Sequence, residues 1–164
     1  MAFTVSSNSF KDGDYLAMTH VGASEHGFGC TGENKSPHLK WSAGPAGTKS
    51  YAVTCYDPDA PTGSGFWHWL VVNIPPDVTE LALGAGSGAG GLPKGALQTR
   101  TDYGFAGYGG PCPPQGDHPH RYLFTVFAVN DMLPVKEETP AAQIGFNLNF
   151  KTLAKATIMG LFKR

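Results

Sequence analysis

The sequence predicts a mainly β protein, and two observations lead to this prediction. The 164 residues include 22 glycines and 13 prolines without any repeat period, which is typical of many strands joined by turns. Three segments have the alternating or continuously apolar pattern of strands, at residues 50–56, 66–74 and 121–130. Nothing in the composition divides the chain, so residues 1–164 are expected to form a single domain.

The predicted strands differ in how they should be covered. In the strand at 50–56, one face is formed by Tyr51, Val53 and Cys55. The segment 66–74 is apolar on both faces, which predicts a central strand covered on both sides. Its period-two pattern groups His68 with Leu70 and Val72.

Weaker patterns predict elements near the two ends of the chain. A first strand is expected at residues 3–5 and a closing strand at 157–162. Thr139 followed by Pro140 has the pattern of a helix N-cap with proline at the first helical position. A helix is therefore predicted over residues 140–154.

The long segment between the two apolar strands is the most informative part of the chain. Eleven of the 22 glycines lie within residues 84–116, and a loop of this length is either functional or mobile. The tip at 84–91 is expected to be mobile. The end of the segment is rich in tyrosine and proline and leads into His120, which predicts a shaped binding loop there.

Composition and charge exclude several classes of protein. The chain has 12 basic and 13 acidic residues and no basic run, which argues against nucleic acid and against an anionic membrane surface as partners. No apolar run approaches the roughly 20 residues needed to span a bilayer, so no membrane insertion is predicted. The N-terminus does not have the pattern of a signal peptide.

The cysteines predict a reducing compartment. Cys30, Cys55 and Cys112 are odd in number and widely spaced, which disfavours a disulfide framework and a cysteine-based zinc site. We therefore expect a cytoplasmic protein with unpaired cysteines. Cys112 is expected to contribute its backbone N–H rather than a reactive thiol.

Three polar groups should meet at one edge of the sheet. The turn at Asp57 ends one strand, His68 lies near the start of the next, and His120 begins the third. In antiparallel neighbours, these positions share one edge. An imidazole beside a carboxylate has a raised pKa and can donate to an anion near neutral pH.

The carboxylate needs a partner for this interpretation to hold. A free Asp57 would repel phosphate, so it should accept a hydrogen bond from His68 or His120. Backbone N–H groups of the glycine-rich loop, at Gly109, Gly110 and Cys112, are expected to complete an anion-binding nest.

The same residues leave an enzyme as the alternative. Asp57, His68 and His120 could act as a general acid and base for hydrolysis, or as a two-histidine, one-carboxylate metal set. No nucleophile motif accompanies them, so no catalytic residue is assigned. His118 is expected to be a solvated loop residue.

These motifs resemble the phosphatidylethanolamine-binding protein family, also called Raf kinase inhibitor proteins. The resemblance covers most of the chain and is closest to the bacterial branch. It is carried by Asp57-Pro-Asp-Ala-Pro61, Trp67-His68-Trp69, Gly110-Pro-Cys-Pro-Pro114, Gly116-x-x-Pro-His120-Arg-Tyr122 and Ser36-Pro-His-Leu-Lys-Trp41. In this order and at this spacing, the motifs are highly specific.

The resemblance implies a β-sandwich with a large antiparallel Greek-key sheet, a smaller sheet and a few peripheral helices. It also implies a small pocket for phosphate-like anions and phosphorylated head groups. The ligand-binding positions carried over are Asp57, His68, Gly110, Pro111, Cys112, Pro113, His120 and Tyr122. The supporting positions are Asp59, Pro61 and Arg121, of which Asp59 and Arg121 are expected to form a structural pair.

The function predicted in this way is that of a small cytoplasmic binding protein for a phosphate-like anion or a phosphorylated small molecule. It is expected not to be an enzyme and to need no cofactor and no metal. The resemblance also allows a protein kinase or a protease as a partner, and a homodimer.

Overall fold

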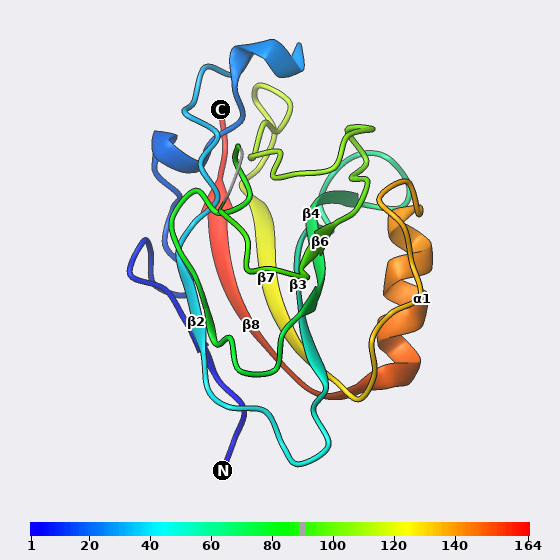
Figure 1. Ribbon diagram of the computed structural model, residues 1–164. Helices are drawn as coiled ribbons and strands as arrows, with labels where there is room; N and C mark the ends of the chain where they lie inside the picture. The colour runs from blue at the N-terminus through cyan, green and yellow to red at the C-terminus, as the bar shows by residue number, and fades with distance from the viewer. Residues whose placement is uncertain (89–90) are drawn as a thin grey trace.

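The computed structural model describes residues 1–88 and 91–164, and its strands form two antiparallel sheets (Figure 1). The strand order of the larger sheet is β6 (Leu97–Gln98), β4 (Phe66–Ile74), β3 (Ser50–Asp57), β7 (His120–Val129) and β8 (Thr152–Phe162). The smaller sheet consists of β1 (Val5–Ser6), β2 (Leu39–Trp41) and β5 (Glu80–Leu81). The helical elements are η1 (Met18–His20) and η2 (Ser24–His26), both 3₁₀, and α1 (Ala141–Lys151). The predicted mainly β fold with a large and a small sheet is confirmed.

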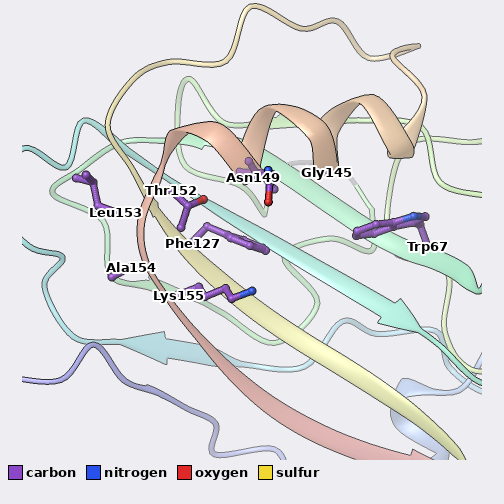
Figure 2. Close-up of a pocket in the computed structure, with 9 residues that line it drawn as sticks. Trp67, Phe127, Gly145, Asn149, Thr152, Leu153, Ala154 and Lys155 are labelled. Atoms are coloured by element: carbon purple, nitrogen blue, oxygen red, sulfur yellow. The ribbon is translucent and has the colours of Figure 1, made fainter.

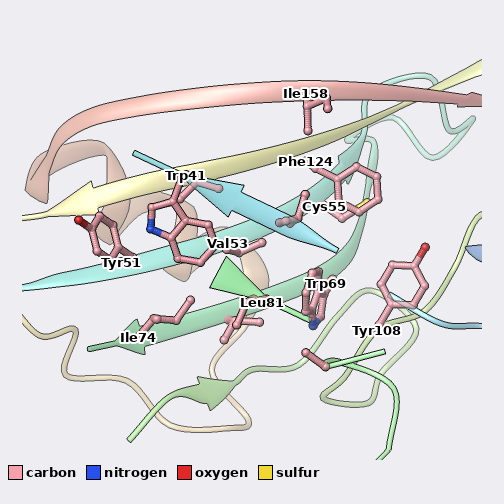
Figure 3. Packing of buried hydrophobic residues seen from close by; sticks show 14 of the residues in the cluster. Trp41, Tyr51, Val53, Cys55, Trp69, Ile74, Leu81, Tyr108, Phe124 and Ile158 are labelled. Atoms are coloured by element: carbon pink, nitrogen blue, oxygen red, sulfur yellow. The ribbon is translucent and has the colours of Figure 1, made fainter. Parts of the chain in front are cut away.

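The larger sheet is covered on one face by the smaller sheet. Trp41 of β2 and Leu81 of β5 pack in one cluster with Tyr51, Trp69 and Phe124 of the larger sheet (Figure 3). All five side chains are almost fully buried, and burying apolar surface of this size is the main driving force for folding. The predicted apolar face of β3 lies in this cluster.

Helix α1 covers the opposite face of the larger sheet (Figure 1). Ile144 and Leu148 lie one turn apart on the helix and pack with Leu70 and Val72 of β4. Strand β4 is therefore buried on both faces, as its continuous apolar pattern predicted. None of the helices in the described part of the chain is long and apolar enough to cross a membrane.

An irregularity in β4 turns a histidine to the other face of the sheet. Tyr56 pairs with Trp67, while the preceding residue of β3 pairs with Trp69, so that His68 is an extra residue in β4. Such a bulge shifts the alternation of side chains by one position. His68 therefore lies on the face opposite Leu70, and the predicted grouping of these two residues is wrong.

The C-terminal elements differ from the prediction at their boundaries. Helix α1 begins at Ala141 with Pro140 as its N-cap, and the Thr139 side chain does not cap it. The Thr139 hydroxyl instead accepts a hydrogen bond from a backbone N–H three residues earlier. Strand β8 starts directly after the helix, at Thr152, because it pairs with β7 along the whole length of that strand.

Cys30 and Cys112 form a disulfide, so the prediction of unpaired cysteines is wrong for this pair. The third cysteine, Cys55, is free and buried in the core. Because disulfides are rare in cytosolic proteins, the cysteines no longer argue for the cytoplasm. Widely spaced cysteines gave no indication of pairing because only the folded chain brings them together. The loop tip predicted to be mobile, at 84–91, includes residues 89 and 90, which lie outside the described residues.

A groove of about 400 Å³ lies between α1 and the larger sheet. Figure 2 shows Gly145 and Asn149 on its helical side and the aromatic rings of Trp67 and Phe127 on the sheet side. None of the ligand-binding residues predicted from the sequence lines this groove. Its size alone therefore does not identify it as the functional site.

A charged pair ties the loop after β3 to the start of β7. The backbone N–H and Nε of Arg121 both donate to Oδ2 of Asp59, at 2.8 and 3.0 Å, and Nη2 donates to Oδ1 at 3.0 Å. These hydrogen bonds hold the pKa of Asp59 below its usual range. The pair fixes the loop that begins at Asp57.

Replacement of Asp59 by asparagine should therefore destabilise the fold in a pH-dependent way. The variant loses charge-assisted hydrogen bonds, so its free energy of unfolding at pH 7 should fall by about 1 kcal/mol. The folded-state pKa of Asp59 is lowered, so the stabilisation is present above the unfolded-state value near 3.9. It is lost as the pH falls through the lower folded-state pKa.

Urea unfolding of the wild type and of Asp59→Asn at pH 7 and at pH 3 measures this difference in the free energy of unfolding. Asp131→Asn is a matched control, because Asp131 is an exposed carboxylate with a single ion pair to Lys151, and it should change stability far less. Equal stability of Asp59→Asn and the wild type at pH 7 would show that the pair does not hold the loop.

Candidate functional site

A cavity of about 160 Å³ opens at the edge of the larger sheet where β3 ends and β4 and β7 begin. Asp57, His68 and His120 reach it from these three strands, so the predicted meeting of the three residues at one edge does occur. The cavity is smaller than the roughly 300–1,000 Å³ typical of sites for drug-sized ligands. Its size suits a small ligand or a head group.

Most of the cavity wall is apolar. It consists of aromatic rings, prolines and small side chains, namely Phe28, Phe66, Tyr103, Tyr122, Pro61, Pro113, Pro114, Ala60, Thr62 and Cys112. Among the positions predicted from the sequence, Gly110, Pro111, Asp59 and Arg121 do not line it. Of these four residues, Asp59 and Arg121 hold the loop after β3 to the start of β7.

A buried ion pair forms the floor of the site. His120 Nδ1 donates to Asp57 Oδ2 at 2.7 Å, and both side chains are almost fully buried. The second ring nitrogen, Nε2, donates to Asp117 Oδ2 at 2.8 Å, while Asp57 Oδ1 accepts from the backbone N–H of Asp59. The expectation that Asp57 accepts a hydrogen bond from one of the two histidines is confirmed for His120.

These contacts decide the protonation of His120. Burial alone would lower its pKa, but the hydrogen bonds to Asp117 and Asp57 outweigh burial and raise the pKa above its ordinary value. With both ring nitrogens donating to carboxylates, His120 has no hydrogen left for a ligand. The prediction that this ring donates directly to an anion does not fit the geometry.

His68, in contrast to His120, is neutral. Its Nδ1 lies 2.7 Å from the carbonyl oxygen of Gly109, and because a carbonyl only accepts, Nδ1 carries the proton. Burial lowers the pKa of His68 from 6.5 to about 4, so the ring is neutral at pH 7. Its Nε2 then holds a lone pair and has no hydrogen-bond partner within residues 1–88 and 91–164.

Tyr122 supplies a hydroxyl that the protein itself does not use. Its Oη is buried and has no hydrogen-bond partner among the described residues. Burial raises the pKa of Tyr122 well above its ordinary value, so the hydroxyl keeps its proton. The ring lies edge-on to His68, with centroids 5.2 Å apart. A buried hydroxyl without a partner is unfavourable, unless a ligand or water supplies one.

The predicted anion nest of backbone N–H groups does not form from the loop glycines. The N–H of Gly109 donates to the carbonyl of His68, and the N–H of Gly110 donates to Oδ1 of Asn34. A Cβ at Gly110 would collide with the backbone of η1, so glycine here permits close packing of two loops rather than anion binding. Of the three expected donors, Cys112 alone keeps an N–H without an acceptor in the described part of the chain.

Several residues of the site were missed by the sequence argument. Asn34 adopts a left-handed conformation with φ 54°, and its amide bonds to both Tyr108 and Gly110. Phe28 reaches the cavity from the segment tied down by the disulfide. No pattern could place these two distant residues, whereas Asp117 lies inside the motif around His120 and could have been included.

A basic side chain lies at the rim. Arg164 donates from Nε to the carbonyl of Pro113 at 2.7 Å and from Nη2 to the carbonyl of Phe28 at 3.1 Å. The carboxylates of Asp57 and Asp117 are thus accompanied by two cations, His120 and Arg164. The immediate surroundings of the cavity are close to neutral rather than acidic.

The alternative metal set is not supported by the geometry. Among the described residues, Asp57, His68 and His120 do not form a group with the spacing of metal ligands. Both oxygens of Asp57 are already hydrogen-bonded, and Nδ1 of His68 is bonded to the backbone. The group that does have this spacing contains His120 but neither of the other two residues.

Comparisons with known proteins agree with this fold. Two Escherichia coli proteins are similar to this chain over most of their length. YbhB is 53% identical over 157 residues, which cover 95% of this chain and 97% of that protein. YbcL is 52% identical over 164 residues, which cover 99% and 88%.

Solved structures give the same result. The crystal structure of E. coli YbcL, described as a new member of the mammalian PEBP family, superposes with a TM-score of 0.95 at 51% identity and covers 100% of this chain and 99% of that one. A Chlamydia trachomatis protein described as a putative PEBP homolog has a TM-score of 0.80 at 29% identity, over 99% of this chain and 98% of that one. The family model described as phosphatidylethanolamine-binding protein matches residues 6–163. The chain therefore belongs to the phosphatidylethanolamine-binding protein family.

Proposed function

We propose that this protein binds a small phosphate-like anion, free or as the phosphate of a head group, in the cavity between β3, β4 and β7. One observation carries the proposal: Tyr122, whose buried hydroxyl has no partner among the described residues, packs edge-on against the neutral ring of His68, and both residues line a cavity of about 160 Å³. One phosphate oxygen can accept a hydrogen bond from the hydroxyl, and a proton taken up together with the anion can lie between a second phosphate oxygen and Nε2 of His68. Both groups are then satisfied.

Anion binding at this site is coupled to a proton. The pKa of His68 is about 4 in the free protein because burial disfavours the charged ring. A dianion in the cavity favours the imidazolium form, so the pKa of His68 rises when the anion binds. The proton enters at Nε2, while Nδ1 keeps its hydrogen bond to Gly109.

The buried ion pair reduces the electrostatic repulsion between Asp57 and an anion in the cavity. Asp57 alone would repel a phosphate, but His120 carries the compensating charge and is held against it at 2.7 Å. Arg164 adds a cation at the rim, and Cys112 offers one free backbone N–H. These features support anion binding through hydrogen bonds and through uptake of a proton by His68.

Binding rather than turnover is favoured by what lines the cavity. Cys112 is held in the disulfide, and the hydroxyl of Thr62 donates to the carbonyl of Gly65. Among the described lining residues, no serine or free cysteine lies beside His68 or His120. Regulation of a protein kinase or a protease stays a prediction from the family resemblance.

Removal of the Tyr122 hydroxyl separates a binding role from a structural one. In Tyr122→Phe, the affinity for inorganic phosphate should fall at least about tenfold, because a hydrogen bond to a charged acceptor is lost. The thermal midpoint should stay unchanged or rise, since the hydroxyl has no partner in the free protein. Isothermal titration calorimetry and thermal unfolding measure the two effects.

Tyr108→Phe is the matched control. Its hydroxyl is also buried but donates to the carbonyl of His20, away from the cavity. This variant should lose stability and keep its affinity for phosphate. The proposal fails if phosphate does not bind to the wild type up to millimolar concentration, or if Tyr122→Phe binds as well as the wild type.

The affinity for sulfate should increase as the pH falls. Sulfate remains a dianion, whereas phosphate monoesters take up a proton near pH 6, so sulfate reports only on protein groups. If His68 gains the proton, the affinity should rise by up to tenfold per pH unit on going from pH 7 towards pH 5. His68→Asn keeps a donor for the Gly109 carbonyl but removes Nε2, so it should abolish the increase. An unchanged pH dependence in this variant would exclude His68 as the proton acceptor.

A further inference from the structure

A second cluster of polar side chains adjoins the cavity through His120, which belongs to both. Asp117, His118 and His120 each offer one ligand atom, and these atoms lie within 4.8 Å of one another. We propose that these three residues bind a divalent transition-metal ion of the zinc class. The sequence predicted no metal and treated His118 as a solvated loop residue, because a lone exposed histidine gives no indication of its neighbours.

The hydrogen bonds to residues outside the cluster use only one nitrogen of each histidine. Nδ1 of His120 faces the carboxylate of Asp57 at 2.7 Å, and Nδ1 of His118 faces the carbonyl oxygen of Pro119 at 2.9 Å. Both partners only accept, so both Nδ1 atoms carry hydrogen and both Nε2 atoms are the available ligands. Carboxylate and carbonyl partners of this kind are the usual outer-shell contacts that orient metal-binding histidines.

The carboxylate of Asp117 is also oriented by hydrogen bonds. Its Oδ1 accepts from the backbone N–H of His118 at 3.0 Å, and its Oδ2 points at Nε2 of His120 at 2.8 Å. An ion would replace the proton now shared between Oδ2 and Nε2. Ligand atoms of a tetrahedral ion with bonds of about 2.0–2.2 Å lie roughly 3.4 Å apart, so only small rotations of the half-exposed Asp117 and the exposed His118 are needed.

The donor set decides the class of ion. Two imidazole nitrogens and one carboxylate oxygen suit Zn²⁺, Co²⁺, Ni²⁺ or Cu²⁺, whereas Ca²⁺ and Mg²⁺ prefer oxygen ligands. Three protein ligands leave at least one coordination position open to water or to an anion. The site differs from the anion cavity in two of its three ligands, because Asp117 and His118 do not line that cavity. The inference therefore does not depend on the proposed function.

The test uses the untagged, chelator-treated full chain in a buffer without phosphate or sulfate. Calorimetric titration with ZnCl₂ should show saturable binding of one ion per chain, and Co²⁺ should give visible absorption bands from ligation by nitrogen and oxygen. His118→Ala and Asp117→Asn should each weaken zinc binding at least about tenfold, the scale of effect seen even for outer-shell partners. His118 is exposed, so its replacement should leave the thermal midpoint unchanged.

His26→Ala is the matched control, because His26 lies outside the cluster, and it should bind zinc like the wild type. His118→Ala should also keep its affinity for phosphate, and Tyr122→Phe should keep its affinity for zinc, so failure of one proposal can be told from failure of the other. Absence of saturable zinc binding up to millimolar concentration would overturn the inference. Equal zinc affinity of the wild type, His118→Ala and Asp117→Asn would overturn it as well.

Discussion

The hydrogen bond between Asp57 and His120 is the constraint on which the rest of the site depends. It joins the last residue of β3 to the first residue of β7, and neither side chain is open to solvent. Loss of one partner would leave a buried charge uncompensated, which costs about 3–5 kcal/mol. The pair between Asp59 and Arg121 lies directly beside it and holds the same loop to the same strand. Together, the two contacts fix the edge of the sheet where the cavity forms.

Because both ring nitrogens of His120 are hydrogen-bonded to carboxylates, a ligand in the cavity has to bond to His68 and Tyr122 instead. His68 lines the cavity and is left neutral by burial, with Nδ1 bonded to the backbone and Nε2 without a hydrogen-bond partner among the described residues. Tyr122 is left as a donor without an acceptor. A neutral acceptor and an unused donor side by side favour a ligand that brings negative charge and draws in a proton. His120 also belongs to both this cavity and the proposed metal site.

Long strands could be predicted from the sequence because their apolar pattern extends over seven or more residues. The prediction for β4 matches its observed bounds, β3 ends one residue later than predicted, and β7 begins and ends one residue earlier than predicted. Strands β2, β5 and β6 were missed because two or three residues carry no periodicity. Their positions are decided by pairing with partners far away in the chain.

Most residues of the site could be predicted from the sequence, but their hydrogen bonds and protonation states could not. Motifs located Asp57, His68, His120 and Tyr122, yet the bulge at His68 and the bond from Gly110 to Asn34 depend on packing. The disulfide between Cys30 and Cys112 also depends on packing, since the two cysteines come together only in the folded chain. Which histidine is charged follows from these contacts, and no pattern in the sequence contains that information.

The most direct test of anion binding at this site is a crystal structure of the protein grown with phosphate. We predict a phosphate oxygen within hydrogen-bonding distance of Tyr122 Oη and another near Nε2 of His68, with the bond between Asp57 and His120 intact. A phosphate bound to His120 with Asp57 displaced, or bound at Arg164 with the cavity unoccupied, would contradict it.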